Sequence, residues 1–307
     1  MVNRRLLGVA AGLGVDRLVG EPRRVPHPVA LFGQAMGEVE RVWYAPRLGN
    51  GAAYAVAGAG IGALAGLAVR STALATYVAV AGRSLADAAT EVGVALDAGD
   101  LDLARTLLPA LVGRDPSALD GTELCRAVVE SVAENTVDAV VAPALWAGLG
   151  GAPVALGYRA VNTMDAMVGH RSERYQRFGT PAARLDDAAN WLPARVTALL
   201  VAVARPGRAS EVWRTVRADA PAHPSPNAGV AEAAFAAALG VRLGGRIQYG
   251  DRTEDRPRLG RGRPVLRDDI HEAVRLSRDC TALLGLTLLG AGLLVDHRAQ
   301  GRGHRRP

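Results

Sequence analysis

A run of 19 residues without a charged side chain, at positions 51–69, constrains the fold of this chain more than any other feature. At a rise of 1.5 Å per residue, a helix of this length spans about 28 Å, which is close to the apolar thickness of a bilayer. Gly58, Gly62 and Gly66 recur at every fourth position, so they share one helix face, where a second backbone can approach closely. The run contains no Ser or Pro, which disfavours the alternative of a Gly/Ala linker. It therefore predicts a membrane-crossing helix that packs through its glycines.

The rest of the chain predicts further apolar helices. Apolar residues make up 49% of the sequence and aromatic residues only 4%, a balance that favours closely packed helices rich in Ala, Gly, Leu and Val. Alternation typical of strands is weak throughout. We therefore expect a mainly α, multi-pass integral membrane protein with a polar helical and loop region between the later spans. Further apolar stretches lie at 4–19, 139–158, 192–204 and 281–295.

The stretch at 139–158 is interrupted by Pro and Gly. Its pattern fits a membrane span, a re-entrant pair of half helices or a buried helix pair.

Arginine placement predicts the orientation of these spans. Arg4 and Arg5 precede the first apolar stretch, and four further arginines follow the last one. The positive-inside rule then places both termini in the cytoplasm and requires an even number of spans, about four, in the cell (inner) membrane. We treat residues 1–307 as one membrane domain that ends in a basic, disordered tail at 296–307.

The residue types exclude several classes of protein. All 36 basic residues are Arg, so the chain has neither the Lys of a Walker A loop nor a Schiff-base Lys for pyridoxal phosphate (PLP). Phosphates must therefore meet Arg, backbone N–H groups or a metal ion. Sparse aromatics and a net charge of only +6 argue against a nucleic-acid partner. Cys125 and Cys280 are far apart and fit no zinc or disulfide pattern, so we interpret them as packing residues.

Three acidic residues spaced by four form the first candidate cluster. Glu130, Glu134 and Asp138 would lie in one stripe along a helix. A solvated helix face has the same pattern. However, the sequence is apolar from Ala139 onward, so the stripe leads into a buried region, where acids are costly unless they bind something. We take Glu130 as a catalytic candidate, and Glu134 and Asp138 as metal ligands.

A second cluster follows at 162–175. Asn162 and Asp165 share a helix face with Gly169, which would leave room for a ligand beside Asp165. Arg171 and Arg174 come directly afterwards and could bind phosphate. Asn162 and Asp165 are therefore catalytic candidates, and the two arginines are phosphate-binding candidates.

A third cluster has the pattern Asp186-Asp187-x-x-Asn190, in which Asp186 and Asn190 lie one helical turn apart, and Arg195 lies further on. Two acids and an amide can hold Mg²⁺ through oxygen ligands, although the same residues also cap helices. We expect Asp186 and Asp187 to bind metal and Arg195 to bind phosphate.

The Pro-rich loop at 223–229 precedes an Ala-rich helix. Asn227 is suited to the N-cap position, and free N–H groups at a helix start favour an anion. His223 and Asn227 are therefore phosphate-binding candidates, while a simple Pro-rich connection is the alternative.

Several longer strings resemble the CobD/CbiB family. The opening Gly20-Glu21-Pro22 and Pro26-His27-Pro28-Val29 is similar to the GDPxxxPHPV motif of that family, with Glu21 where Asp is usual. His170 also departs from the family, where Tyr is common. The resemblance covers nearly the whole chain in order. The strings that carry it are VESVAENTVDAVVAP (129–143), YRAVNTMDAMVGHRSERY (158–175), ARLDDAANWLPARVTALL (183–200) and HPSPNAGVAEAAFAAALGVRLGG (223–245).

The resemblance implies an integral membrane enzyme of cobalamin biosynthesis. The family attaches (R)-1-amino-2-propanol, or its O-phosphate, to the f-propionate carboxylate of (adenosyl)cobyric acid and forms an amide. ATP and Mg²⁺ are the expected cofactors. The expected partners are the corrinoid, the aminopropanol (phosphate), membrane lipid and, as a further possibility, other membrane enzymes of the pathway.

The candidate residues suit this chemistry. A carboxylate condenses with an amine only after activation, and ATP would convert it into an acyl phosphate while Mg²⁺ and Arg neutralise phosphoryl charge. A base would keep the amine unprotonated. Two alternatives remain open. One is a membrane transporter that uses buried acids as a relay, which predicts an inverted repeat. The other is a Mg²⁺-dependent membrane phosphotransferase, which predicts a denser acidic motif.

Overall fold

The computed structural model describes the chain except for residues 1, 23–25, 114, 171, 250–251 and 304–307, and it leaves the side chains of 246–254 and 296–303 undescribed. About 80% of the chain is helical, which confirms the prediction of a mainly α fold. The sheet formed by the described residues is one antiparallel hairpin of two strands, β1 and β2.

The chain divides into two compact units. The assignment of residues 1–307 to one domain stays a prediction. The chain passes from one unit to the other after Ala81, Val137, Asn190 and Leu283, so each unit is assembled from separate segments. Unit 1 consists of 1–81, 138–190 and 284–307, and unit 2 consists of 82–137 and 191–283. Two helices, α11 (Thr180–Ala204) and α14 (Asp268–Gly303), contribute residues to both units.

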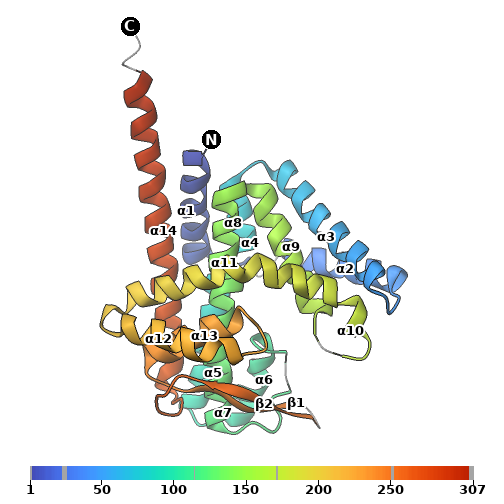
Figure 1. Cartoon of the computed structure of the whole chain (residues 1–307), viewed down its shortest axis with the longest axis vertical. Helices are drawn as coiled ribbons and strands as arrows, with labels where there is room; N and C mark the ends of the chain where they lie inside the picture. The colour runs from blue at the N-terminus through green and yellow to red at the C-terminus, as the bar shows by residue number, and fades with distance from the viewer. Residues whose placement is uncertain (1, 23–25, 114, 171, 250–251, 304–307) are drawn as a thin grey trace. The chain divides into compact units, whose positions relative to one another are not determined.

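Unit 1 is built entirely from helices (Figure 1). Its core is a cluster of buried side chains from α2, α3, α9 and α10, among them Met36, Tyr54, Met164 and Phe178. The elements are α1 (Val2–Val19), α2 (Pro28–Trp43), α3 (Leu48–Val69), α4 (Thr72–Ala79), a π-helical turn (Val137–Val141), α8 (Ala142–Gly150), α9 (Ala152–Val168), α10 (Tyr175–Phe178), the first part of α11 (Thr180–Ala204) and the second part of α14 (Asp268–Gly303).

The glycine face of α3 packs directly on α9, as the spacing of the glycines predicts. A Cβ atom at Gly62 would lie 2.5 Å from the carbonyl oxygen of Leu156, and one at Gly66 would collide with Ala152. Because no side chain separates the two helices there, their backbones meet closely. The opposite face of α3 is exposed and apolar, with Val56 at 69% exposure and Leu64 at 65%.

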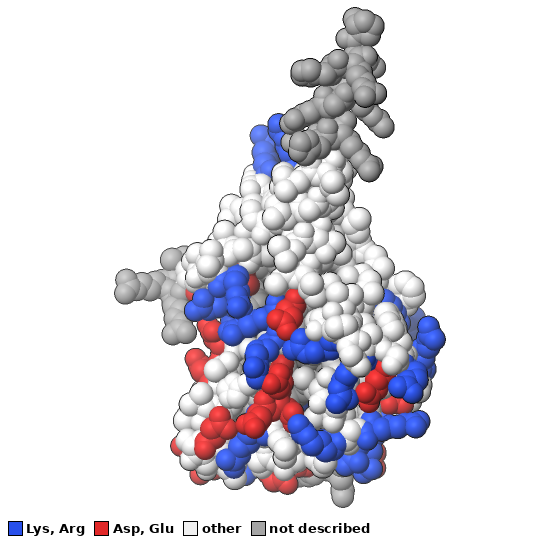
Figure 2. Space-filling view, turned by 90° about the vertical axis from the view of Figure 1, so that its left-hand side faces the viewer, with Lys and Arg blue, Asp and Glu red and all other residues white. Residues whose placement is uncertain are grey.

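The second half of α14 runs beside α1 (Figure 1), although the two helices lie far apart in the sequence. A Cβ atom at Gly292 would lie 3.0 Å from Leu7, and one at Gly285 would lie 3.8 Å from Leu13. The exposed surface around this half of α14 carries almost no charged side chains (Figure 2). The helical backbone continues to Gly303, through most of the segment predicted to be a disordered tail.

Two helices in the described part of the chain have the length and composition of a membrane span: α3 (Leu48–Val69) and the Asp268–Val295 part of α14. The sequence predicts about four such spans. The stretch at 139–158 fails as a single span because the chain turns at Gly151, where φ is 75°, a conformation that favours glycine. The result is a helix pair, α8 and α9, which agrees with two of the three arrangements expected for this stretch, the pair of half helices and the buried helix pair.

Unit 2 surrounds α13, an Ala-rich helix whose described residues are almost all buried. Helices α7 and α12 pack on α13, and the hairpin of β1 and β2 contacts all three. A hairpin was not expected from the sequence. The elements are α5 (Gly82–Asp97), α6 (Leu101–Leu107), η1 (Leu108–Ala110), α7 (Gly121–Thr136), η3 (Pro206–Arg208), α12 (Ala209–Asp219), η4 (Ala220–Ala222), α13 (Ala228–Leu239), β1 (Leu243–Tyr249) and β2 (Arg252–Leu259), with the remaining parts of α11 and α14.

Candidate functional site

Asp186 lies at the centre of a buried polar network in unit 1. Its Oδ1 accepts a hydrogen bond from Asn162 Nδ2 at 3.2 Å, and its Oδ2 accepts one from Asn190 Nδ2 at 2.9 Å. The Tyr158 hydroxyl donates to Asn190 Oδ1 at 2.8 Å and lies 3.2 Å from the backbone oxygen of Asp138. Helices α9 and α11 therefore bring together the amide of the second predicted cluster and the acid of the third.

Burial makes the negative charge of Asp186 costly. The side chain is almost fully buried, and its hydrogen-bond partners are neutral amides. Burial raises the pKa of Asp186 from 3.8 to about 6, although the hydrogen bonds from Asn162 and Asn190 oppose this rise. Burial also raises the pKa of the adjacent Asp187. A buried acid that meets only neutral donors is stabilised by a proton or a cation.

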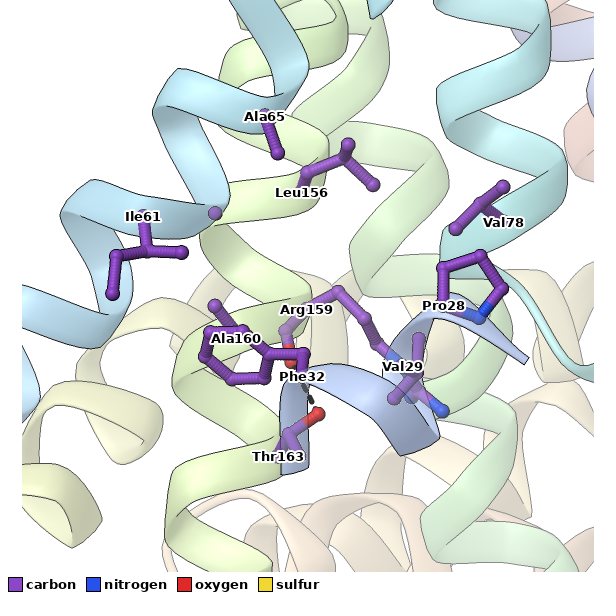
Figure 3. A pocket seen from close by; sticks show the side chains of 11 residues that line it. Pro28, Val29, Phe32, Ile61, Ala65, Val78, Leu156, Arg159, Ala160 and Thr163 are labelled. Atoms are coloured by element: carbon purple, nitrogen blue, oxygen red, sulfur yellow. Dashed lines mark hydrogen bonds between the residues drawn. The ribbon is translucent and has the colours of Figure 1, made fainter. Parts of the chain in front are cut away.

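An apolar pocket of about 100 Å³ opens beside this network, also in unit 1 (Figure 3). Its walls come from α2, α3, α4 and α9, and its polar side chains are Arg159 and Thr163. Arg159 Nη1 donates to Asn162 Oδ1 at 3.2 Å, so the guanidinium connects the pocket to the Asp186 network. Pro28 and Val29, which come from the Pro-His-Pro-Val string, line the pocket as well.

The space next to Asp165 differs from the expectation. Gly169 was predicted to leave room for a ligand, but the carboxylate of Asp165 itself occupies that space. A Cβ atom at position 169 would collide with Asp165 Oδ1. The half-buried Asp165 therefore lies against the end of α9, and Gly169 is needed to accommodate its side chain.

The two arginines predicted to bind phosphate after α9 have different outcomes. Arg171 lies outside the described residues. Arg174 is exposed, forms an ion pair with Glu40 at 3.0 Å and stacks on the ring of Tyr44, with 4.0 Å between its Cζ and the ring centroid. Its guanidinium is therefore already engaged by an acid and an aromatic ring.

The three acidic residues spaced by four lie in different environments. Glu130 is buried in unit 2, where its Oε1 accepts from the Gly244 backbone N–H at 2.8 Å and lies 3.7 Å from Arg126 Nε. Glu134 is exposed on α7, and Asp138 is half-buried in unit 1. Among the described residues, no group of three or more His, Cys, Asp or Glu side chains is placed to hold a metal ion. The predicted metal roles of these residues stay predictions.

In unit 2 the structure brings Arg195 to Asn227, whereas His223 Nε2 lies 3.8 Å from Glu232 Oε1, and the phosphate-binding role of all three stays a prediction. Arg195 Nη1 donates to Asn227 Oδ1 at 3.0 Å, and its guanidinium stacks on the Trp191 ring. Asn227 occupies the N-cap position of α13, but its side chain does not cap the helix. Ser225 Oγ instead accepts from the backbone N–H of residue 228 at 3.1 Å, because the Asn227 side chain faces Arg195.

Sequence reasoning missed Arg159 and Tyr158. Arg159 is a single cation that follows a long apolar stretch, and a charged residue in such a place is a functional candidate. That signal was available from the sequence. Tyr158 had no comparable signal, because its role depends on the approach of α11.

Comparison with known proteins gives consistent matches. The family model described as CobD/Cbib protein matches residues 9–277. "Cobalamin biosynthesis protein CobD" of Mycobacterium tuberculosis is 48% identical over 307 residues, covering 96% of this chain and 97% of the relative. "Cobalamin biosynthesis protein CbiB" of Salmonella typhimurium is 39% identical, covering 90% and 94%, and CobD of Geobacter metallireducens is 44% identical, covering 80% and 83%. No solved structure matches the chain significantly.

Proposed function

The chain belongs to the CobD/CbiB family, and from this membership we infer that it is an enzyme of cobalamin biosynthesis. We propose that it is an ATP-dependent ligase. Its substrates would be (adenosyl)cobyric acid and aminopropanol or aminopropanol phosphate, joined as an amide at the f-propionate carboxylate. The observation that carries the proposal is the family match over residues 9–277.

The proposed reaction has two steps. The corrin carboxylate first takes the γ-phosphoryl group of ATP, which gives an acyl phosphate and ADP. The amine nitrogen then attacks the acyl carbon, inorganic phosphate leaves, and one proton passes from nitrogen to a base. The half-buried Asp165 on α9 is our candidate for that base.

The Asp186 network suits the activation step. Asp186 is a buried carboxylate without a cationic hydrogen-bond partner, and Asp187 places a second carboxylate beside it. Mg²⁺ commonly binds through one or two carboxylates together with substrate phosphates. Asp186 and Asp187 would therefore hold Mg²⁺, which, when bound, would offset the charge of the phosphates of ATP.

We also propose that the protein resides in the cell membrane. The outward face of α3 and the second half of α14 expose large apolar side chains, including Val56 and Leu64 on α3 and Leu286 and Leu294 on α14. These surfaces would contact lipid acyl chains, where burying apolar area is favourable. Contacts with other membrane enzymes of the pathway remain part of this proposal.

The proposed reaction can be tested in membranes from cells that express this chain and lack their own copy. With adenosylcobyric acid, aminopropanol phosphate, ATP and Mg²⁺, we expect a corrin mass gain that matches the amide and disappears without ATP. Asp165→Asn should abolish turnover in correctly inserted protein, whereas Asp102→Asn, at an exposed acid on α6, should leave it unchanged. Absence of a mass gain with either amine would contradict the ligase proposal.

A further inference from the structure

The most unusual side chain of the apolar pocket is Arg159. Its Nη1 donates to Asn162, but its Nε is buried and has no acceptor among the described residues. No described carboxylate forms an ion pair with it. A buried donor without an acceptor costs about 1–3 kcal/mol, and more when the donor is charged. A charged donor of this kind is best satisfied by an anion.

The arrangement of the guanidinium indicates which anion fits. With Nη1 engaged by Asn162, the remaining edge of Arg159 consists of Nε and Nη2. Because Nε has no accessible surface, Nη2 is the group that can donate a charge-assisted hydrogen bond to a carboxylate oxygen in the pocket. Figure 3 shows the side chain extending from α9 across the pocket toward Pro28 and Val29, so this end of the pocket carries its positive charge.

The size and lining of the pocket restrict the rest of the ligand. About 100 Å³ is small beside the roughly 300–1,000 Å³ of pockets that enclose drug-sized molecules. The walls are aliphatic, with Ile61, Ala65 and Leu156 among them, and the Thr163 hydroxyl already donates to the Arg159 backbone oxygen at 2.8 Å. The pocket therefore suits a short aliphatic chain that ends in a single negative charge.

We propose that this pocket binds the reactive propionate arm of the corrin substrate, with Arg159 holding its carboxylate. This inference rests on the proposed function, which supplies a substrate with such an arm. The two methylene groups would contact the aliphatic walls while the macrocycle stays outside. An aminopropanol phosphate fits less well, because its ammonium and doubly charged phosphate would both require partners that the apolar walls lack.

The proposed position also places the carboxylate beside the activating residues. Arg159 contacts Asn162, and Asn162 contacts Asp186, so the three side chains form a continuous polar chain from the pocket into the network. A carboxylate held by Arg159 would therefore be connected to the proposed Mg²⁺ ligand Asp186 through Asn162. Arg159 would also stabilise the negative charge of the acyl phosphate.

A binding experiment without ATP or amine tests the subsite directly. The probes are cobyric acid and the same corrin with its free carboxylate converted to a primary amide, each titrated into the purified full-length protein in detergent and followed by corrin absorbance. Arg159→Gln should weaken binding of the acid by about 10- to 100-fold, as expected for loss of a charge-assisted pair. It should change binding of the amide by less than about twofold.

Further variants separate a lost contact from a lost fold. Arg159→Lys keeps the positive charge with a different donor geometry and should bind the acid with intermediate affinity. Ala65→Leu should fill the pocket from the exposed side of α3 and weaken acid binding while Arg159 remains. Arg184→Gln, at an exposed position on α11, is the matched control and should bind both corrins like the wild type.

The outcomes distinguish this subsite from the proposed function. The subsite is wrong if Arg159→Gln binds the acid like the wild type, if it weakens both corrins equally, or if the wild-type protein binds neither corrin. Acid binding that depends on Arg159, without any amide formation in the complete reaction, would overturn the ligase proposal and keep the subsite. Ligation that Arg159→Gln leaves unchanged would overturn the subsite and keep the ligase proposal.

Discussion

Glu130 in unit 2 and Asp186 in unit 1 are both buried carboxylates on helices, and the sequence predicts a chemical role for each. Their partners differ. Glu130 accepts a hydrogen bond from the Gly244 backbone and faces Arg126, so its charge is balanced and it anchors the start of β1. Asp186 accepts only from the amides of Asn162 and Asn190, which solvate its charge without neutralising it.

This difference indicates that burial alone does not identify a functional acid. A carboxylate that faces a guanidinium is neutralised within the fold, and removing it leaves the partner uncompensated. A carboxylate held by neutral amides remains costly until a proton or a cation arrives. We therefore expect the substitution of Asp186 to affect chemistry and the substitution of Glu130 to affect stability.

Of the three effects that test this comparison, the largest expected is that of Asp186→Asn on turnover. The amide keeps the size of the side chain but cannot supply the negative charge that a metal ion requires. We expect the rate of amide formation to fall about 1,000-fold, which corresponds to an activation free energy that is higher by roughly 4 kcal/mol. The rate should be measured at saturating substrate, with Glu173→Gln, at an exposed acid of unit 1, as the control. Turnover within a few-fold of the wild type would contradict the role of Asp186.

A smaller effect concerns the pH dependence of stability. The pKa of Asp186 is raised from 3.8 to about 6 by folding, so its contribution to stability is complete below pH 4 and is lost as the pH rises through 6. The free energy of unfolding should therefore fall by roughly 3 kcal/mol between pH 3 and pH 8 in the absence of divalent cations. Denaturant unfolding in detergent measures this change. The same fall in Asp186→Asn would show that another group causes it.

The smallest of the three effects is that of Glu130→Gln on stability. The amide can still accept from Gly244, but it no longer balances the charge of Arg126. We expect the free energy of unfolding to fall by about 2 kcal/mol, with the turnover of the folded fraction unchanged. Unfolding curves and the rate per folded molecule would be compared. Loss of turnover in stably folded Glu130→Gln would restore Glu130 as a catalytic candidate and remove the contrast between the two acids.

The sequence predicted the local features of this fold better than its assembly. The face of Gly58, Gly62 and Gly66 was predicted because a spacing of four directly encodes a helix face, and the structure confirms close packing there. The hairpin of β1 and β2 was missed because its strands are polar and carry no alternation of apolar residues. Its place depends on contacts with α7, α12 and α13 that no local pattern records.

The candidate site was predictable to the same extent. The spacing of Asp186 and Asn190 indicated a contact one helical turn apart, and their hydrogen bond confirms it. The contact of Asn162 with Asp186 joins α9 to α11, so it depends on packing between helices. One partner of Glu130 is also distant in the sequence, because Gly244 comes from β1.

The pairing of α1 with the second half of α14 has a consequence for biosynthesis. Leu13 lies against Gly285, so the side of α1 that faces α14 is completed only after the ribosome has made nearly the whole chain. At ordinary translation rates the interval is on the order of 15 to 50 seconds. During that time this apolar side of α1 must be covered by something other than its final neighbour, so α1 depends on its surroundings until α14 has been made.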